Sequence, residues 1–286
     1  MKKILVPVDF SDAVKPAIKF AANLARKTGA ELYLLHVIDI PGTSAELTES
    51  GEWSFTQDST SGDVPLMMFM LKEIKKKMEA LKSSDELRGI KVTDNISTGS
   101  PAAQITASAK KIVADLIAMG THGASGWNEV FVGSNTEKVV RTSPVPVLAI
   151  KEQVNINPAT IVFVSDFKDE ANAIFPFAKK FAEIFGAKLH LLKVNTLDTF
   201  ETTRELNESI NKFKAKHNVP DYPVEIYNDL DKETGIIYFA KETNADMIIA
   251  GTHGRSGISR MFNSSISEEL VNHSFCPVLT IHFSGK

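Results

Sequence analysis

The chain has 286 residues, of which 43% are apolar, enough for two domains of ordinary size with packed cores. Its 32 basic and 35 acidic side chains leave a formal charge of −3, which argues against nucleic acid as a partner. No apolar run approaches the roughly 18 residues of a membrane span, and the single cysteine excludes an intrachain disulfide. Because residues 1–9 also lack a signal-peptide pattern, we expect a cytoplasmic protein with no membrane partner.

The first half of the chain alternates short apolar runs with helical patterns. Strands are predicted at 3–8, 31–37, 92–97, 116–119 and 145–150, and helices at 15–27, 67–81, 102–113 and 137–141. This alternation is typical of βαβ units, which form a parallel sheet covered by helices on both faces. In such sheets ligands bind beyond the carboxyl ends of the strands.

The second half repeats the first, which indicates an internal duplication. Residues 161–167 resemble residues 4–10 at an offset of 157, whereas residues 277–279 repeat residues 146–148 at an offset of 131. The first half therefore carries additional residues between its two matched blocks. We expect two similar domains, at residues 1–151 and 160–286.

The additional residues lie at 41–64, a stretch rich in Gly, Ser, Thr and acidic side chains. This composition predicts a long surface loop. A tolerated insertion is the favoured interpretation, and a lid over a binding site in the first domain is the alternative.

A glycine pattern occurs in both halves, each time after an apolar run and before a predicted helix. The first copy is G-T-H-G at 120–123, followed after nine residues by Gly133 and Ser134; the second is G-T-H-G at 251–254, followed by Ser264 and Ser265. A glycine-lined turn before a helix N-terminus can hold phosphate, because backbone N–H groups point outward there and glycine lets a ligand come close.

Asp9 ends the first predicted strand and Gly120 ends the fourth, so both belong to the carboxyl edge of one parallel sheet. A carboxylate at that edge can accept hydrogen bonds from ribose hydroxyls, or it can cap the following turn, and the two roles can coexist. The S-x-x-E runs at 134–137 and 265–268 predict capping boxes at two helix starts.

Residue types that carry catalysis or bind metals are sparse. His122 and His253 have no second His or Cys at metal-ligand spacing, so we interpret them as turn-stabilising residues. Cys276 lies in an apolar run and is interpreted as a buried structural thiol. The chain lacks the phosphate-loop, nucleophile-elbow and C-x-x-C patterns. We therefore predict no catalytic and no metal-binding residues.

Taken together, the chain resembles a tandem universal stress protein. The resemblance is carried by V-P-V-D-F-S at 6–11, G-S-P at 99–101, A-D-L-I at 114–117 and S-P-V-P-V-L at 143–148, together with G-x2-G-x9-G-[ST], which marks the nucleotide-binding branch of that family. It implies two Rossmann-like α/β domains. Each would be a five-stranded parallel sheet with helices on both faces, and the two would pair through their last strands.

The resemblance also implies that the first domain binds ATP. By carry-over, Pro7 and Asp9 would flank adenine and ribose, and Val37 would contact adenine. The residues that would approach the ribose or hold the phosphates, with or without Mg²⁺, are Gly120, Gly123, Gly133, Ser134 and Asn135.

The second domain departs from the family pattern. Ser264 replaces the third glycine and Leu230 stands where the first half has Gly99, and a Cβ that blocks close backbone approach weakens phosphate binding. Arg255, by contrast, supplies a favourable charge. Because backbone access is a steric requirement, we rank the first site ahead. The candidate residues of the second site are Asp166, Gly251, Gly254, Arg255, Ser264 and Ser265.

The leading hypothesis is an ATP-binding stress-response regulator without strong catalytic activity, formed as an intrachain pseudo-dimer. This hypothesis also allows a further homodimer and unidentified protein partners. One alternative is a slow ATPase. Another is a scaffold, or a binder of another small ligand, in which the nucleotide motif is vestigial.

Overall fold

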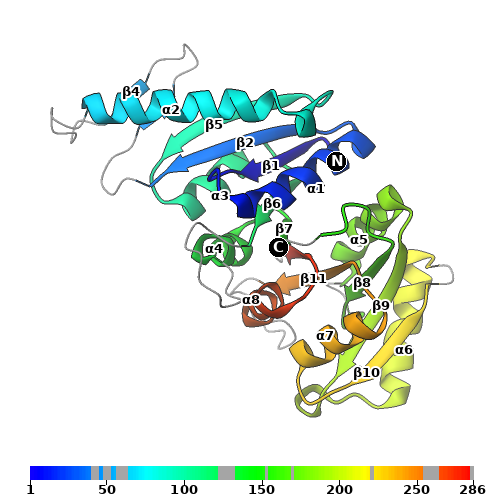
Figure 1. Cartoon of the computed structure of the whole chain (residues 1–286). Coiled ribbons are helices and arrows are strands. Elements are labelled where there is room, and N and C mark those ends of the chain that lie inside the picture. Colours follow the sequence, from blue (N-terminus) through cyan, green and yellow to red (C-terminus); the bar gives the residue numbers. More distant parts are fainter. Residues whose placement is uncertain are drawn as a thin grey trace.

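The computed structural model describes residues 1–39, 45–47, 53–55, 64–121, 133–151, 154–168, 171–219, 222–253 and 264–283. Their strands form one twelve-stranded sheet in the order β10-β9-β8-β11-β12-β7-β6-β1-β2-β5-β3-β4 (Figure 1). The two halves of the chain occupy the two halves of this sheet. No helix among these residues is long and apolar enough to cross a membrane.

The first half contains five mutually parallel strands, in the order β7-β6-β1-β2-β5. Their bounds are β1 (Lys3–Pro7), β2 (Glu31–Ile38), β5 (Val92–Thr98), β6 (Leu116–Gly120) and β7 (Val147–Ile150). The connecting helices are α1 (Lys15–Thr28), α2 (Val64–Lys82), α3 (Pro101–Lys111) and α4 (Ser134–Thr142). The predicted strands and helices are thus present, with bounds shifted by a few residues at most.

The strands of the second half are again parallel, in the order β10-β9-β8-β11-β12. This order matches that of the first half read from its other end, β5-β2-β1-β6-β7. The strands are β8 (Thr160–Val164), β9 (Lys188–Asn195), β10 (Val224–Asn228), β11 (Met247–His253) and β12 (Val278–Phe283). The helices are α5 (Ala171–Phe185), α6 (Thr203–His217), α7 (Lys232–Glu242) and α8 (Ser264–His273).

The last strands of the two halves join them into one sheet. β7 and β12 are antiparallel, with Leu148 opposite Leu279 and Val147 opposite Thr280. This pairing confirms the predicted contact between the last strands. It also covers the two strand edges that would otherwise be exposed to intermolecular pairing.

Two apolar layers cover the sheet, one on each face. The first includes α1, α5, α6 and Met78 of α2, and the second includes α3, α4, α7 and α8. Along β1 the side chains alternate between the layers, with Ile4 and Val6 in the first and Leu5 in the second. The predicted helix-on-both-faces arrangement is therefore confirmed.

The insertion contains secondary structure that the sequence did not predict. β3 (Ala45–Leu47) and β4 (Trp53–Phe55) form an antiparallel pair, and β3 extends the sheet beyond β5 through Glu46 opposite Ser97. The prediction of a loop throughout 41–64 is wrong at these residues, because strands of three residues are too short to show a periodic pattern. The other residues between 40 and 63 lie outside the described residues.

Candidate functional site

A cavity of about 310 Å³ opens at the carboxyl edge of the first half, between the ends of β1, β2 and β6 and the start of α4. Of the residues predicted for the first site, it brings together Pro7, Asp9, Val37, Gly120, Gly133, Ser134 and Asn135. Gly123 and His122 lie outside the described residues. Thr136, at the start of α4, also lines the cavity, and the lining residues that sequence reasoning missed are Val8, Val14, Leu35, Pro101, Ile105 and Met119.

The cavity has one apolar side and one polar side. Leu35, Ile105 and Met119 are buried members of the core layer beneath it, so their exposed atoms offer an apolar surface to a flat ring. Asp9 and the first turn of α4 supply the polar side. The missed apolar residues could have been found by asking which strand ends and which crossover helix meet at the switch point of the sheet.

Asp9 is exposed at the end of β1 and forms a local turn. Its Oδ1 accepts hydrogen bonds from the backbone N–H of Ser11 (3.0 Å) and from the Ser11 hydroxyl (2.7 Å). Asp9 therefore has the turn-forming role and also lines the cavity, so the two predicted roles are sterically compatible.

The start of α4 differs from the predicted capping box. Gly133, with φ −57° and ψ 136°, is the N-cap, and no side-chain hydrogen bond caps this helix. Ser134 is the first helical residue, so the prediction that it caps the helix is wrong. The first N–H groups of an α-helix have no intrahelical acceptor, and here they are at the cavity. Their partial positive charge suits an anion.

A hydrogen bond ties this helix start to the sheet. The Thr136 hydroxyl donates to the carbonyl oxygen of Gly120 at 3.0 Å. Gly120 is required for a packing reason: a Cβ there would lie 2.4 Å from the carbonyl oxygen of Ala13. Neither Gly120 nor Gly133 has a positive φ, so left-handed backbone does not explain these glycines, and at Gly120 close packing does.

In the second half, α7 packs closely on the strand that corresponds to β2. A Cβ at Gly235 of α7 would lie 2.7 Å from Cγ1 of Val194, so α7 packs directly against β9. Val194 is 5% exposed, whereas Val37, its counterpart on β2, is half-buried and lines the first cavity. Gly251 packs against the end of Ile174.

The other predicted residues of the second site have mixed outcomes. Asp166 is buried at the end of β8, where its Oδ1 accepts a hydrogen bond from the backbone N–H of Lys168 at 2.9 Å, in a turn like that of Asp9. α8 begins at Ser264, so Ser265 lies within the helix and is not the predicted N-cap. Gly254 and Arg255 lie outside the described residues.

The turn before α7 is one residue longer than the turn before α3. Thr98 pairs with Ile38 and Asn228 with Asn195 at equivalent strand ends. Two residues then lead to α3, whereas three lead to α7. Leu230 is the second residue before α7, as Gly99, with its φ of +117°, is the second residue before α3. The added residue places Leu230 one position further from its strand than Gly99 is.

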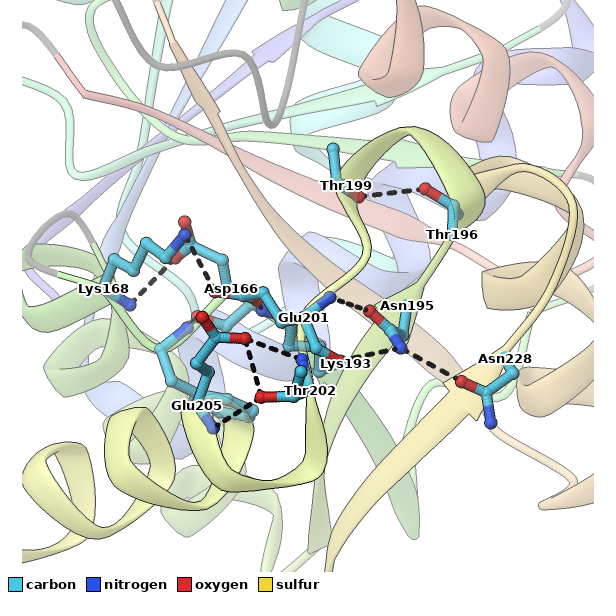
Figure 2. A network of polar contacts seen from close by, with 12 residues as sticks. Asp166, Lys168, Lys193, Asn195, Thr196, Thr199, Glu201, Thr202, Glu205 and Asn228 are labelled. Atoms are coloured by element: carbon cyan, nitrogen blue, oxygen red, sulfur yellow. Dashed lines mark hydrogen bonds and ion pairs between the residues drawn. The ribbon is translucent and has the colours of Figure 1, made fainter.

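A buried charged group in the second half was not predicted. Lys193, on β9, is 1% exposed, and its ammonium group pairs with Glu201, which also pairs with Lys168 at 3.1 Å (Figure 2). Burial, with a contribution from Lys168, lowers the pKa of Lys193 to about 8. A lysine directly after the apolar pair Leu191 and Leu192 was the available signal. Because side chains alternate along β9, Lys193 lies on the face of the sheet that α5 and α6 cover, whereas Val194 lies on the other face.

Cys276 is buried and free, and burial raises the pKa of its thiol to about 11. This agrees with the predicted structural thiol. No group of three His, Cys, Asp or Glu side chains within the described ranges is placed to hold a metal ion.

Comparison with known proteins identifies the family. The sequence model of the universal stress protein family matches residues 1–151 and, a second time, residues 159–282. The chain belongs to the universal stress protein family. It is a tandem member, and the sequence resemblance is confirmed.

Relatives match both one half and the whole chain. A universal stress protein of Methanocaldococcus jannaschii is 34% identical over 53% of this chain and 96% of its own length. One from Synechocystis is 23% identical over 98% of this chain and 99% of its own. The crystal structure of a universal stress protein from Archaeoglobus fulgidus covers 98% of both chains with a TM-score of 0.74 at 20% identity, which shows a shared fold.

Proposed function

We propose that the first domain binds ATP and that the protein acts as a nucleotide-dependent regulator in the stress response. The observation that carries the proposal is the cavity of about 310 Å³, with an apolar side, a carboxylate and a helix N-terminus around one volume. That volume is at the lower end of the range usual for small-molecule sites.

Each part of the cavity suits one part of the nucleotide. The apolar surface near Val37 and Ile105 suits adenine, and Asp9 suits the ribose hydroxyls. The N–H groups at the start of α4 suit the phosphates. Oxygen atoms of Ser134 and Asn135, together with phosphate oxygens, suit Mg²⁺, which prefers oxygen ligands.

We propose binding without strong catalysis. The carboxylate among the described lining residues is Asp9, and its Oδ1 already accepts two hydrogen bonds from Ser11. Bound nucleotide would act by favouring one arrangement of the segments around the site.

We also propose that the protein is cytoplasmic, that its domains are residues 1–151 and 160–286, and that it has no nucleic-acid or membrane partner.

Calorimetry with ATP and Mg²⁺ tests the proposal on the parent chain, on Gly133→Ala and on the matched variant Ser264→Ala. Because Gly133 has an ordinary φ of −57°, alanine fits its backbone conformation, and we expect the added Cβ to hinder close approach of a ligand. We expect at least tenfold weaker binding in Gly133→Ala and unchanged binding in Ser264→Ala. Absence of ATP binding to the parent would refute the proposal and favour the scaffold alternative.

A further inference from the structure

Three large apolar side chains are exposed on two neighbouring loops at the carboxyl edge of the second half. Leu197 and Leu230 are each 79% exposed, and Phe200 is 66% exposed. They lie on the two loops that follow β9 and β10, on the opposite side of the second half from its junction with the first. We call these three residues the β9–β10 patch.

The loops that carry the patch are tied to each other. The Asn195 side chain accepts a hydrogen bond from the backbone N–H of Glu201 (3.0 Å) and donates one to Oδ1 of Asn228 (3.2 Å). The backbone N–H of Asp229 donates to the carbonyl oxygen of Asn195 at 3.2 Å. Figure 2 shows the two side-chain contacts of Asn195. Together with the Asp229 contact, they join the loop that carries Leu197 and Phe200 to the turn that carries Leu230.

Ion pairs of Glu201 and the N-terminal cap of α6 also fix the loop that carries Leu197 and Phe200. Glu201 pairs with the buried Lys193 and with Lys168. The adjoining Thr202 and Glu205 form a reciprocal capping box at the start of α6. A loop fixed by so many polar contacts cannot readily fold its apolar side chains inward, so their exposure is built into the native structure.

The first half shows what occupies the equivalent position. There the chain's own β3 lies beside β5 and pairs antiparallel at Ser97, which is opposite Val37 of β2. The equivalent residue of β10 is Tyr227, opposite Val194 of β9. Among the described strands, β10 is the end of the sheet, so its outer edge keeps unpaired backbone groups.

Acidic side chains outnumber basic ones on the loops that carry the β9–β10 patch. Asp198 and Asp231 are exposed next to Leu197 and Leu230, and Asp229 is half-buried in the same turn. Lys232, which follows Asp231 and interacts with Asp198, offsets one of these charges. The surface therefore combines an open strand edge, apolar anchors and a net negative charge.

We propose that the β9–β10 patch docks an extended, basic segment of a partner protein, which adds to β10 as β3 adds to β5. Main-chain pairing with the open edge would supply affinity, and the apolar anchors with the acidic surround would select alternating apolar and basic side chains. The proposal does not depend on nucleotide binding by the first domain.

A pair of synthetic peptides tests this proposal. The first alternates leucine and lysine, and the second has glutamate in place of lysine; both carry blocked ends and a fluorescent label. Fluorescence anisotropy is measured with the full chain, with Leu197→Ser/Leu230→Ser and with the control Phe275→Ser. Phe275 is also an exposed apolar residue of the second half, 42% exposed, but it precedes β12 and so lies near the amino-terminal ends of the parallel strands, away from the β9–β10 patch.

We expect the lysine peptide to bind the parent and Phe275→Ser alike and to lose at least tenfold in affinity with the double serine variant. Binding should weaken as salt rises, and amides of β10 should exchange more slowly in the complex. Equal binding of both peptides, or equal binding by the double serine variant, would overturn the proposal. So would self-association of the parent that the serine variant loses, because a second copy would then occupy the patch.

Discussion

Gly120 and Gly251 occupy the same position in the two halves and offer a matched pair of substitutions. A Cβ at Gly120 would lie 2.4 Å from the carbonyl oxygen of Ala13, 3.1 Å from its carbonyl carbon and 3.3 Å from Cα of Val14. All three atoms belong to the backbone. A Cβ at Gly251 would lie 2.2 Å from Cδ1 of Ile174, whose other atoms are 3.5 Å away or more.

The two alanine variants should therefore differ in stability. A relaxed carbon–oxygen contact is about 3.3 Å, so Gly120→Ala must move the Ala13–Val14 backbone by roughly 0.9 Å. Overpacking that shifts backbone costs about 3 kcal/mol. Gly251→Ala needs only a rotation of the Ile174 side chain, which costs about 1 kcal/mol.

Urea unfolding measures the difference. Far-ultraviolet circular dichroism follows the unfolding of both variants. We expect Gly120→Ala to lower the urea midpoint far more than Gly251→Ala lowers it. Equal losses, or a larger loss for Gly251→Ala, would refute the reasoning from backbone contact.

Three further predictions concern caps, buried charge and the thiol. Thr202→Ala should cost about 1 kcal/mol in urea unfolding because it breaks a capping box, whereas Ser134→Ala should stay within roughly 0.5 kcal/mol because its helix has no side-chain cap. Glu201→Gln should cost about 3 kcal/mol at pH 7 by leaving Lys193 charged, buried and unpaired. Because the pKa of Lys193 is lowered to about 8, this cost should shrink at pH 9, where the native amine is neutral; a pH-independent cost would contradict this. Cys276 should resist a thiol reagent at pH 8 in the native chain and react at once in urea, since its thiol is buried with a pKa raised to about 11.

The duplication made much of the fold readable from the sequence. Apolar runs such as residues 3–8 and 116–119 are buried on both faces of a parallel sheet, so they stand out as continuous runs. Seeing the same order of runs twice fixed two similar halves. Asp9 and Gly120 could be placed at one sheet edge because parallel strands end at the same edge.

Local sequence patterns predicted the start of α4 and the short strands of the insertion less well. The S-x-x-E run at 134–137 matched a capping box, but Gly133 became the N-cap because the helix begins one residue earlier than the pattern predicts. β3 and β4 were missed because each has three residues and gains its stability from pairing at the edge of β5.

By itself, the sequence determined the duplicated α/β halves and part of the lining of the first cavity, and its family resemblance implied the pairing of the last strands. Only the tertiary structure decided how closely α7 packs on β9, because the contact of Gly235 with Val194 joins residues that are 41 positions apart and leaves no local pattern. It also decided that Lys193 is paired and buried, and that Leu197, Phe200 and Leu230 are exposed beside an open strand. Periodicity records which face of an element is apolar, whereas burial depends on what the rest of the chain places against that face.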